Sequence, residues 1–227
     1  MTCGNIAEND NVDCLLPAGT LTGGSKVYGK GWSGVGSNST AVVCVTGGST
    51  LYGGSGSLVA AKDMTSVSDP GGGSAMGALN LSNGVTRTIA GGNYRYSSIN
   101  LTGGSKLIFS GQVILHIDGN ISVSNGSSIQ ISSGGVILYM NGQKIDLTGG
   151  AIVNVTQASK NFIIYGSPLL TSVKLTGGAN LHGLLHAPMA NISLTGGQQT
   201  FGAMVGDTII MSNGAAVHYD ESLATGP

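Results

Sequence analysis

The chain has 227 residues, enough for one large folded domain with a substantial core. Only 8% of its residues are charged, the formal net charge is −1 and 41% of the residues are hydrophobic, a balance that excludes the disordered class of proteins. Nine Lys and Arg residues spread over this length form no basic stripe, which argues against nucleic acid as a partner and against charge-driven contact with a membrane.

Residues 1–18 are predicted to form an N-terminal cap. Cys3 and Cys14 flank a polar loop and are the candidate disulfide, a bond that would suit an oxidising compartment. An odd number of cysteines leaves one thiol over, so a Cys14–Cys44 pair and three unpaired thiols stay open as alternatives. The absence of a C-x-x-C motif argues against a structural zinc site.

From residue 21 onward, one short pattern recurs along the chain: an apolar residue, then Thr or Ser, then Gly-Gly or Asn-Gly. Most copies are separated by about 17 to 28 residues, the spacing of stacked supersecondary units. The one longer interval contains residues 62–78, which are interpreted as an inserted loop or an extra turn. The nine copies begin at Leu21, Val45, Leu81, Leu101, Val123, Leu147, Leu175, Leu194 and Met211.

The residues before each corner alternate between polar and apolar, as in "SINLTGG", "KIDLTGG" and "NISLTGG", and this alternation predicts β-strands. Gly-Gly and Asn-Gly supply the positive φ that a tight corner needs. We therefore expect residues 1–227 to form a single all-β domain, a parallel β-helix of nine or ten coils. A β-sandwich is the alternative, but repetition of one specific corner favours the helix. Right-handed coils are expected because parallel β crossovers prefer that hand.

The Thr or Ser of each copy should point outward and form a column of hydroxyls along the helix. A regular hydroxyl array suits ice binding or contact with a polysaccharide, whereas Thr is also a common strand residue whose hydroxyl bonds locally. The column two residues earlier is mixed and includes Asp146 and Lys174, which argues against a flat ice-binding face. The hydroxyl column comprises Thr22, Thr46, Ser82, Thr102, Ser124, Thr148, Thr176, Thr195 and Ser212.

The sequence contains no recognisable catalytic constellation, and neither a cofactor nor a metal site is predicted. Asp118 and Asp146, the acids in the middle of the chain, have no evident reason to meet as the paired carboxylates of a glycosidase. His182 and His186 in "HGLLH" would stand about 13 Å apart on a strand, too far for one metal ion.

Exposed aromatic residues are the candidates for a binding surface. Tyr28, Trp32 and Tyr52 lie near the N-terminal coils. Tyr94 and Tyr96 lie in "GGNYRYSS", which is interpreted as a loop and forms a second candidate patch.

The C-terminal part of the chain carries the most specific pattern. A turn at residues 187–190 ("APMA") is followed by "GAMV" at 202–205 and by "HYDE" at 218–221. Residues 100–223 thereby resemble the C-terminal β-helix domain of bacterial PilX-type envelope proteins, which are associated with type IV pilus assembly. The family commonly has Tyr before the "AP" turn, where this chain has His186.

That resemblance implies a structural or adhesive role in the cell envelope or outside the cell, with protein partners of a pilus or envelope assembly, or surface glycans. It brings no catalytic residues, and residues 215–227 with "HYDE" are expected to act as a C-terminal cap and tail. No run of about 18 apolar residues occurs, so this segment is not expected to insert into a membrane, and we expect it to be cut from a longer membrane-anchored chain. The alternatives are a β-helix that binds or cleaves polysaccharides, and an ice-binding solenoid.

Overall fold

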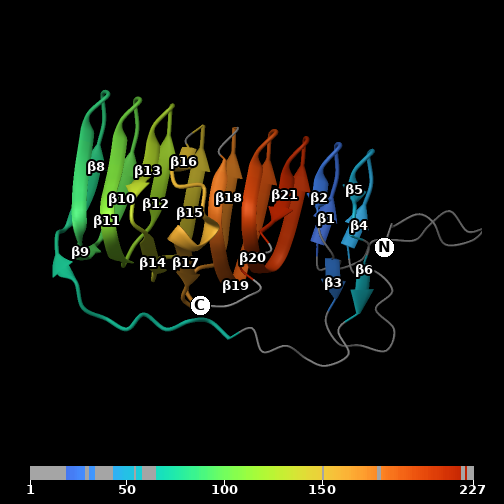
Figure 1. Ribbon diagram of the computed structural model, residues 1–227, viewed down its shortest axis with the longest axis horizontal. Coiled ribbons are helices and arrows are strands. Elements are labelled where there is room, and N and C mark those ends of the chain that lie inside the picture. The colour runs from blue at the N-terminus through green and yellow to red at the C-terminus, as the bar shows by residue number, and fades with distance from the viewer. Residues whose placement is uncertain are drawn as a thin grey trace, which may run out of the picture.

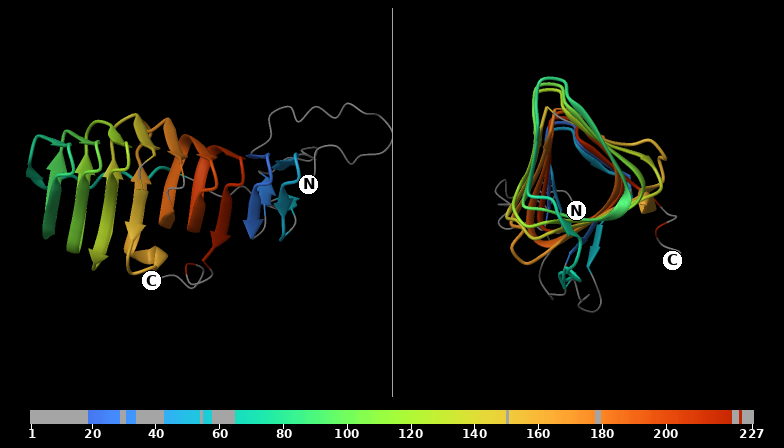
Figure 2. Two further views of the ribbon diagram at one scale, coloured as in Figure 1. Left: turned by 90° about the horizontal axis from the view of Figure 1, so that it is seen from above. Right: turned by 90° about the vertical axis from the view of Figure 1, so that its left-hand side faces the viewer.

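The computed structural model describes residues 19–28, 31–33, 43–53, 55–57, 65–149, 151–177, 180–220 and 223. They form a β-solenoid of triangular cross-section in which neighbouring coils are joined by parallel strand pairing (Figures 1 and 2). One sheet contains 19 strands and a second contains two. The predicted all-β parallel solenoid is confirmed, with about eight turns in place of nine or ten.

Each complete coil contributes a strand segment to three faces. The first face comprises β8 (Ala78–Leu81), β10 (Ser98–Leu101), β12 (Ile121–Ser124), β15 (Lys144–Thr148), β18 (Ser172–Thr176), the ends of β19 (Leu181–Thr195) and β20 (Gln199–Ser212), β1 (Gly19–Leu21) and β4 (Val43–Val45). The second face comprises the starts of β9 (Thr86–Tyr96) and β11 (Lys106–Ile117), β13 (Ser128–Ser133), β16 (Ala151–Asn154), the starts of β19 and β20, β21 (Ala216–Tyr219), β2 (Lys26–Tyr28) and β5 (Thr50–Leu51).

The third face is built from shorter pieces. It comprises β7 (Ser74–Ala75), the ends of β9 and β11, β14 (Val136–Met140), β17 (Phe162–Gly166) and the middles of β19 and β20. β3 (Gly31–Ser33) and β6 (Ser55–Ser57) form the separate two-stranded sheet, and the 3-10 turn η1 (Ser159–Asn161) precedes β17.

Alternating burial along the strands builds one core through the solenoid. Leu101, Val123 and Leu147 pair in register on successive coils and are at most 1% exposed. The residues that flank them in each strand point outward. Stacking the coils therefore buries a continuous apolar core even though the chain has few charged residues.

The recurring corner is a turn of two successive left-handed residues. Gly103 and Gly104 have φ of 64° and 75°, and Asn125 and Gly126 have 52° and 73°. The corner also bonds along the axis, because the Gly104 N–H donates to the carbonyl of Asn125 at 2.9 Å. Each corner therefore continues the backbone ladder between coils and does not interrupt it.

The coils are not stacked in chain order. β1 pairs with both β20 and β4, and β2 pairs with both β21 and β5, so the N-terminal coils extend the C-terminal end of the solenoid (Figure 1). This seam is bonded like the other coil contacts: the Thr22 N–H donates to the Met211 carbonyl at 2.8 Å, and the Gly214 N–H to the Gly23 carbonyl at 2.8 Å.

Two expectations are corrected by this order. The sequence predicts that "HYDE" belongs to a C-terminal cap, but its first two residues, His218 and Tyr219, end β21, an interior strand that pairs on both sides. Residues 62–78 were expected to be an inserted loop between adjacent coils. Their described part is a connection that leads to the opposite end of the solenoid, where it joins β7 and β8 (Figure 1).

Residues 65–73, here called the strap, run along the third face and are held by side chains from several coils. The carboxylate of Asp69 accepts hydrogen bonds from His116 Nδ1 at 2.6 Å, Asn141 Nδ2 at 2.5 Å and the Gly71 N–H at 2.7 Å. Farther along, His186 Nε2 donates to the Thr65 carbonyl at 2.9 Å.

Beneath the strap, the rings of His116, Tyr139, Tyr165 and His186 follow one another on successive coils, with centroids 5.4, 5.6 and 6.3 Å apart. Burial alone would raise the pKa of Asp69, but the hydrogen bonds from Asn141, Gly71 and His116, together with the charge of His116, lower it below the ordinary 3.8.

The corner geometry predicts which glycines tolerate a side chain. A Cβ at Gly142 would overlap the carbonyl oxygen of Gly119 on the neighbouring coil, whereas a Cβ at Gly104 would meet no atom within 4 Å. Gly104→Ala should cost about 1–2 kcal/mol for its left-handed backbone, and Gly142→Ala about 3 kcal/mol or more because the coils must separate. Urea unfolding of both variants checks this, and equal losses would contradict it.

The strap contacts predict that Asp69→Asn destabilises the fold by about 2 kcal/mol, since it removes a charged acceptor from buried donors. Asp118→Asn is the matched control. Both carboxylates pair with Arg95, Asp69 at 3.4 Å and Asp118 at 2.6 Å. The Asp118 side chain is 44% exposed, against 11% for Asp69, so Asp118→Asn should cost less than about 1 kcal/mol of stability.

The pH dependence of this loss follows from the lowered pKa of Asp69. The charged carboxylate stabilises the fold above pH 3.8, and that contribution is lost as pH falls through the pKa of the folded state. Unfolding curves of the parent chain and Asp69→Asn should therefore converge in acid. A gap that stays constant down to pH 2 would contradict the assignment.

Candidate functional site

The structure separates the predicted aromatic candidates into different environments. Tyr28 and Tyr52 are 40% and 58% exposed, in line with a surface role. Tyr96 is 1% exposed and belongs to the core, so its assignment to a surface patch was wrong. The reason is that "GGNYRYSS" is not a loop but the end of β9, where alternation turns Tyr96 inward beside Ile117.

Tyr94 and Trp32 do not join that surface in the described part of the structure. Tyr94 is half-buried, and its hydroxyl donates to the Ala90 carbonyl at 3.1 Å. Trp32 lies in β3, but its side chain is outside the described residues, as are Cys3, Cys14 and the cap predicted for residues 1–18.

Tyr28 and Tyr52 belong to a stack of five rings that crosses the second face, one ring per coil. This aromatic column comprises His182, Phe201, His218, Tyr28 and Tyr52. Its successive centroids lie 4.4, 4.5, 4.5 and 4.7 Å apart, with interplanar angles of 8° to 11°.

The spacing of the aromatic column is set by the backbone. Strands in a sheet lie about 4.8 Å apart, so in-register rings on adjacent coils stack face to face. Each such contact adds about 0.5–1.5 kcal/mol beyond the area that it buries. Within the stack, each ring face packs against the face of the neighbouring ring. Tyr52 is the last ring at one end of the column, so its outer face does not pack against another ring of the column.

Sequence reasoning missed the column because its members come from separated parts of the chain. A signal was present: each of the five residues stands four positions after the second residue of its corner turn. The same offset in other coils holds Thr88, Ile108, Gln130 and Asn154, and the residue that pairs in register with Gln130 is Val153. The five rings become consecutive only because the N-terminal coils stack on the C-terminal coil.

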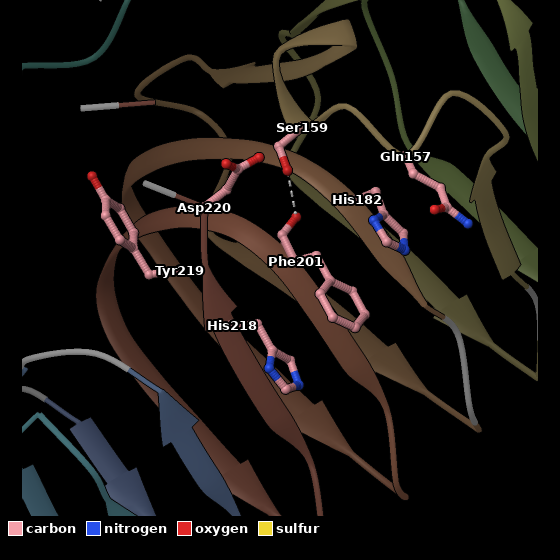
Figure 3. Close-up of a pocket in the computed structure, with 7 residues that line it drawn as sticks. All are labelled: Gln157, Ser159, His182, Phe201, His218, Tyr219 and Asp220. Atoms are coloured by element: carbon pink, nitrogen blue, oxygen red, sulfur yellow. Dashed lines mark hydrogen bonds between the residues drawn. The ribbon is translucent and has the colours of Figure 1, made fainter. Parts of the chain in front are cut away.

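A groove of about 490 Å³ lies beside the aromatic column (Figure 3). Its floor is formed by the rings of β19, β20 and β21, and its rim by the segment around η1, by Tyr219 at the end of β21 and by Asp220. The lining residues are Gln157, Ser159, His182, Phe201, His218, Tyr219 and Asp220.

The rim of the groove is anchored to the coils beneath it. Ser159 is buried and its hydroxyl donates to the Phe201 carbonyl at 3.0 Å, as Figure 3 shows. Asn154 Nδ2 donates both to the Ala158 carbonyl at 2.9 Å and to the His182 carbonyl at 3.1 Å. Gln157 has a left-handed φ of 52° and an exposed side chain. The rim is thus held at a set position relative to the rings.

The groove carries little charge, since Asp220 is the acidic residue among its seven described lining residues. Burial lowers the pKa of His182 and His218 below the ordinary 6.5, and the charge of Asp220 only partly opposes this at His182. Both imidazoles are therefore neutral at pH 7. His218 Nε2 donates to Gln199 Oε1 at 2.9 Å, which fixes its tautomer. None of the seven lining residues is Lys or Arg.

Asp118 and Asp146, the acids in the middle of the chain, form ion pairs with neighbouring basic side chains. Asp118 pairs with Arg95 at 2.6 Å, and Asp146 pairs with Lys144 at 2.9 Å while accepting a hydrogen bond from Thr148. His182 lies at the start of β19 on the second face and His186 lies in its middle on the third face, so a corner separates the two residues. Within the described residues, no three His, Cys, Asp or Glu side chains are placed to hold a metal ion.

The predicted hydroxyl column is present in register on the first face. Several of its members form hydrogen bonds along the column: Ser124 Oγ donates to Thr102 Oγ1 at 3.4 Å, Ser212 Oγ donates to Thr195 Oγ1 at 3.3 Å, and Thr22 Oγ1 donates to the Met211 carbonyl at 3.5 Å. The adjacent column holds Asp146 and Lys174 in register, as predicted. These bonds give the hydroxyls a structural role in the ladder.

The lowered pKa values of His182 and His218 predict a loss of stability in mild acid. Protonation of either imidazole destabilises the folded state, because the folded pKa lies below that of the unfolded chain. The two neutral imidazoles therefore contribute fully to the free energy of unfolding above pH 6.5, and this contribution declines as pH falls from 6.5 through their folded pKa values. The double substitution His182→Phe with His218→Phe keeps the rings and should flatten the decline between pH 7.5 and 5. Proton NMR titration of the parent chain should give both pKa values below 6.5, and values above it would contradict the prediction.

Comparison with known proteins places the chain in a family without assigning it an activity. A search of curated proteins finds no match. Within the described residues, the structure contains no helix whose length and apolar character would let it cross a membrane. A family model described as a domain of unknown function matches residues 60–226, which includes the floor and rim of the groove and leaves the N-terminal coils outside the match. The chain therefore belongs to the DUF7305 family.

Proposed function

We propose that this domain is a non-enzymatic adhesion module that acts outside the bacterial cell, in a pilus-associated or other envelope assembly. The observation that carries the proposal is the aromatic column, five stacked rings at one outward position on consecutive coils. Aromatic residues are enriched at the centres of binding interfaces because they bury much area at small entropic cost.

Two further observations support adhesion over catalysis. Asp69, Asp118 and Asp146 are committed to ion pairs and hydrogen bonds that hold the strap and strands. The resemblance of residues 100–223 to PilX-type β-helix domains points to an envelope assembly as the setting. A solenoid bonded coil to coil presents its surface rigidly, so little entropy is lost when a partner binds.

The test is adhesion of labelled domain to whole bacterial cells and isolated envelopes, followed by co-sedimentation. Tyr28→Ala with Tyr52→Ala should weaken adhesion about tenfold, the effect of losing a hot-spot contact of about 1.4 kcal/mol. Leu169→Ala with Met189→Ala is the control, because these side chains are 60% and 57% exposed and lie outside the aromatic column.

The same incubations should release no soluble sugar from the envelopes. Release of reducing ends would overturn the non-enzymatic assignment. Adhesion that survives loss of Tyr28 and Tyr52 but falls with the control pair would show that another face makes the contact.

A further inference from the structure

The groove beside the aromatic column has features of a ligand site. Its volume of about 490 Å³ lies in the usual range of about 300–1,000 Å³ for ligand pockets. Its lining combines an apolar floor, at Phe201, with polar groups on the rim, at Gln157 and Tyr219 (Figure 3). Gln157 is exposed and Tyr219 is 47% exposed, so both present polar atoms to solvent.

The charges in the groove disfavour the binding of anionic polymers. The two imidazoles are neutral at pH 7 because burial lowers their pKa values, and the groove has no Lys or Arg. Asp220 adds a carboxylate to the same lining. A phosphate, sulfate or uronate would meet no opposite charge there and would be repelled by Asp220.

Uncharged sugars match what the groove offers. The hydroxyls of a sugar both donate and accept hydrogen bonds, as do the Gln157 amide and the Tyr219 phenol, and the Asp220 carboxylate accepts them. Because these rings are stacked face to face, the floor offers their apolar edges, and the C–H groups of a sugar ring suit such a surface. The aromatic column continues from the groove through His218 to Tyr28 and Tyr52 on the next two coils, which would extend the contact along the solenoid axis.

From these observations we propose that the groove is a binding site for an uncharged glycan, a chain of hexose or N-acetylhexosamine units. The inference rests on the proposed adhesive function and names its partner. The segment of the chain that belongs to the family contributes all seven lining residues, since each lies within residues 60–226.

The experiment is affinity electrophoresis of the full chain through native gels that contain one polymer each. Dextran, a soluble β-glucan and glycol chitin represent uncharged or N-acetylated chains, and alginate and polygalacturonate represent anionic ones. At least one polymer of the first group should retard the chain at pH 7.5, and both polyuronates should leave its mobility unchanged.

The variants target exposed rim residues, so the fold is preserved. Gln157→Gly suits the left-handed backbone of residue 157, and Tyr219→Ala removes an exposed phenol. Each should weaken retardation about tenfold. Val153→Ala, on the same face and 43% exposed, should leave it unchanged. Circular dichroism and thermal unfolding verify that each variant is folded.

The outcomes separate this inference from the adhesion proposal. Retardation by polyuronates as strong as by uncharged glycans, or retardation that ignores Gln157→Gly and Tyr219→Ala, overturns the glycan site. If the chain adheres to envelopes through Tyr28 and Tyr52 yet migrates freely in every gel, the glycan site fails while adhesion stands, and a protein partner is indicated. If gels retard the chain but envelopes do not hold it, the site stands and the adhesive role fails.

Discussion

The structure depends on parallel backbone pairing between successive coils, which is kept continuous through corners of two left-handed residues. Gly-Gly and Asn-Gly meet this need because they accept positive φ at small cost. Because each corner bonds to the next, each coil follows the register of its neighbour along most of its strands, with shifts at irregularities such as that between Ala187 and Asn191. This constraint aligns Leu, Thr and ring residues into columns, and it lets a chain with 8% charged residues form a large core.

The same pairing allows coils from opposite ends of the chain to join. Any segment that carries the corner and the alternating strand can extend an exposed coil edge, and β1 and β2 do so on β20 and β21. The cost is a long connection back to the first coil. The strap makes that connection along the third face, and the Asp69 carboxylate holds it there with donors from His116 and Asn141.

The candidate site follows from this arrangement. Stacking the N-terminal coils on β21 extends a stack of three rings to five. The three rings of β19, β20 and β21, on coils stacked in chain order, form the floor of the groove. Because the imidazoles there are half-buried and their pKa values lie below 6.5, they are neutral at pH 7, and the surface is aromatic and polar without being strongly charged. Such a surface recognises shape and hydrogen bonding more than charge.

By itself, the sequence determined the fold class, the nine corners, the buried Leu and Val positions and the outward hydroxyl column, because these depend on short-range periodicity and on backbone preferences of Gly and Asn. It also placed five rings at one offset from their corners. Only the tertiary structure decided the order of the coils, since local patterns are alike in every coil and do not specify which two will stack. That order made Tyr28 a neighbour of His218, and it made β21, which the sequence assigns to a cap, an interior strand that pairs on both sides.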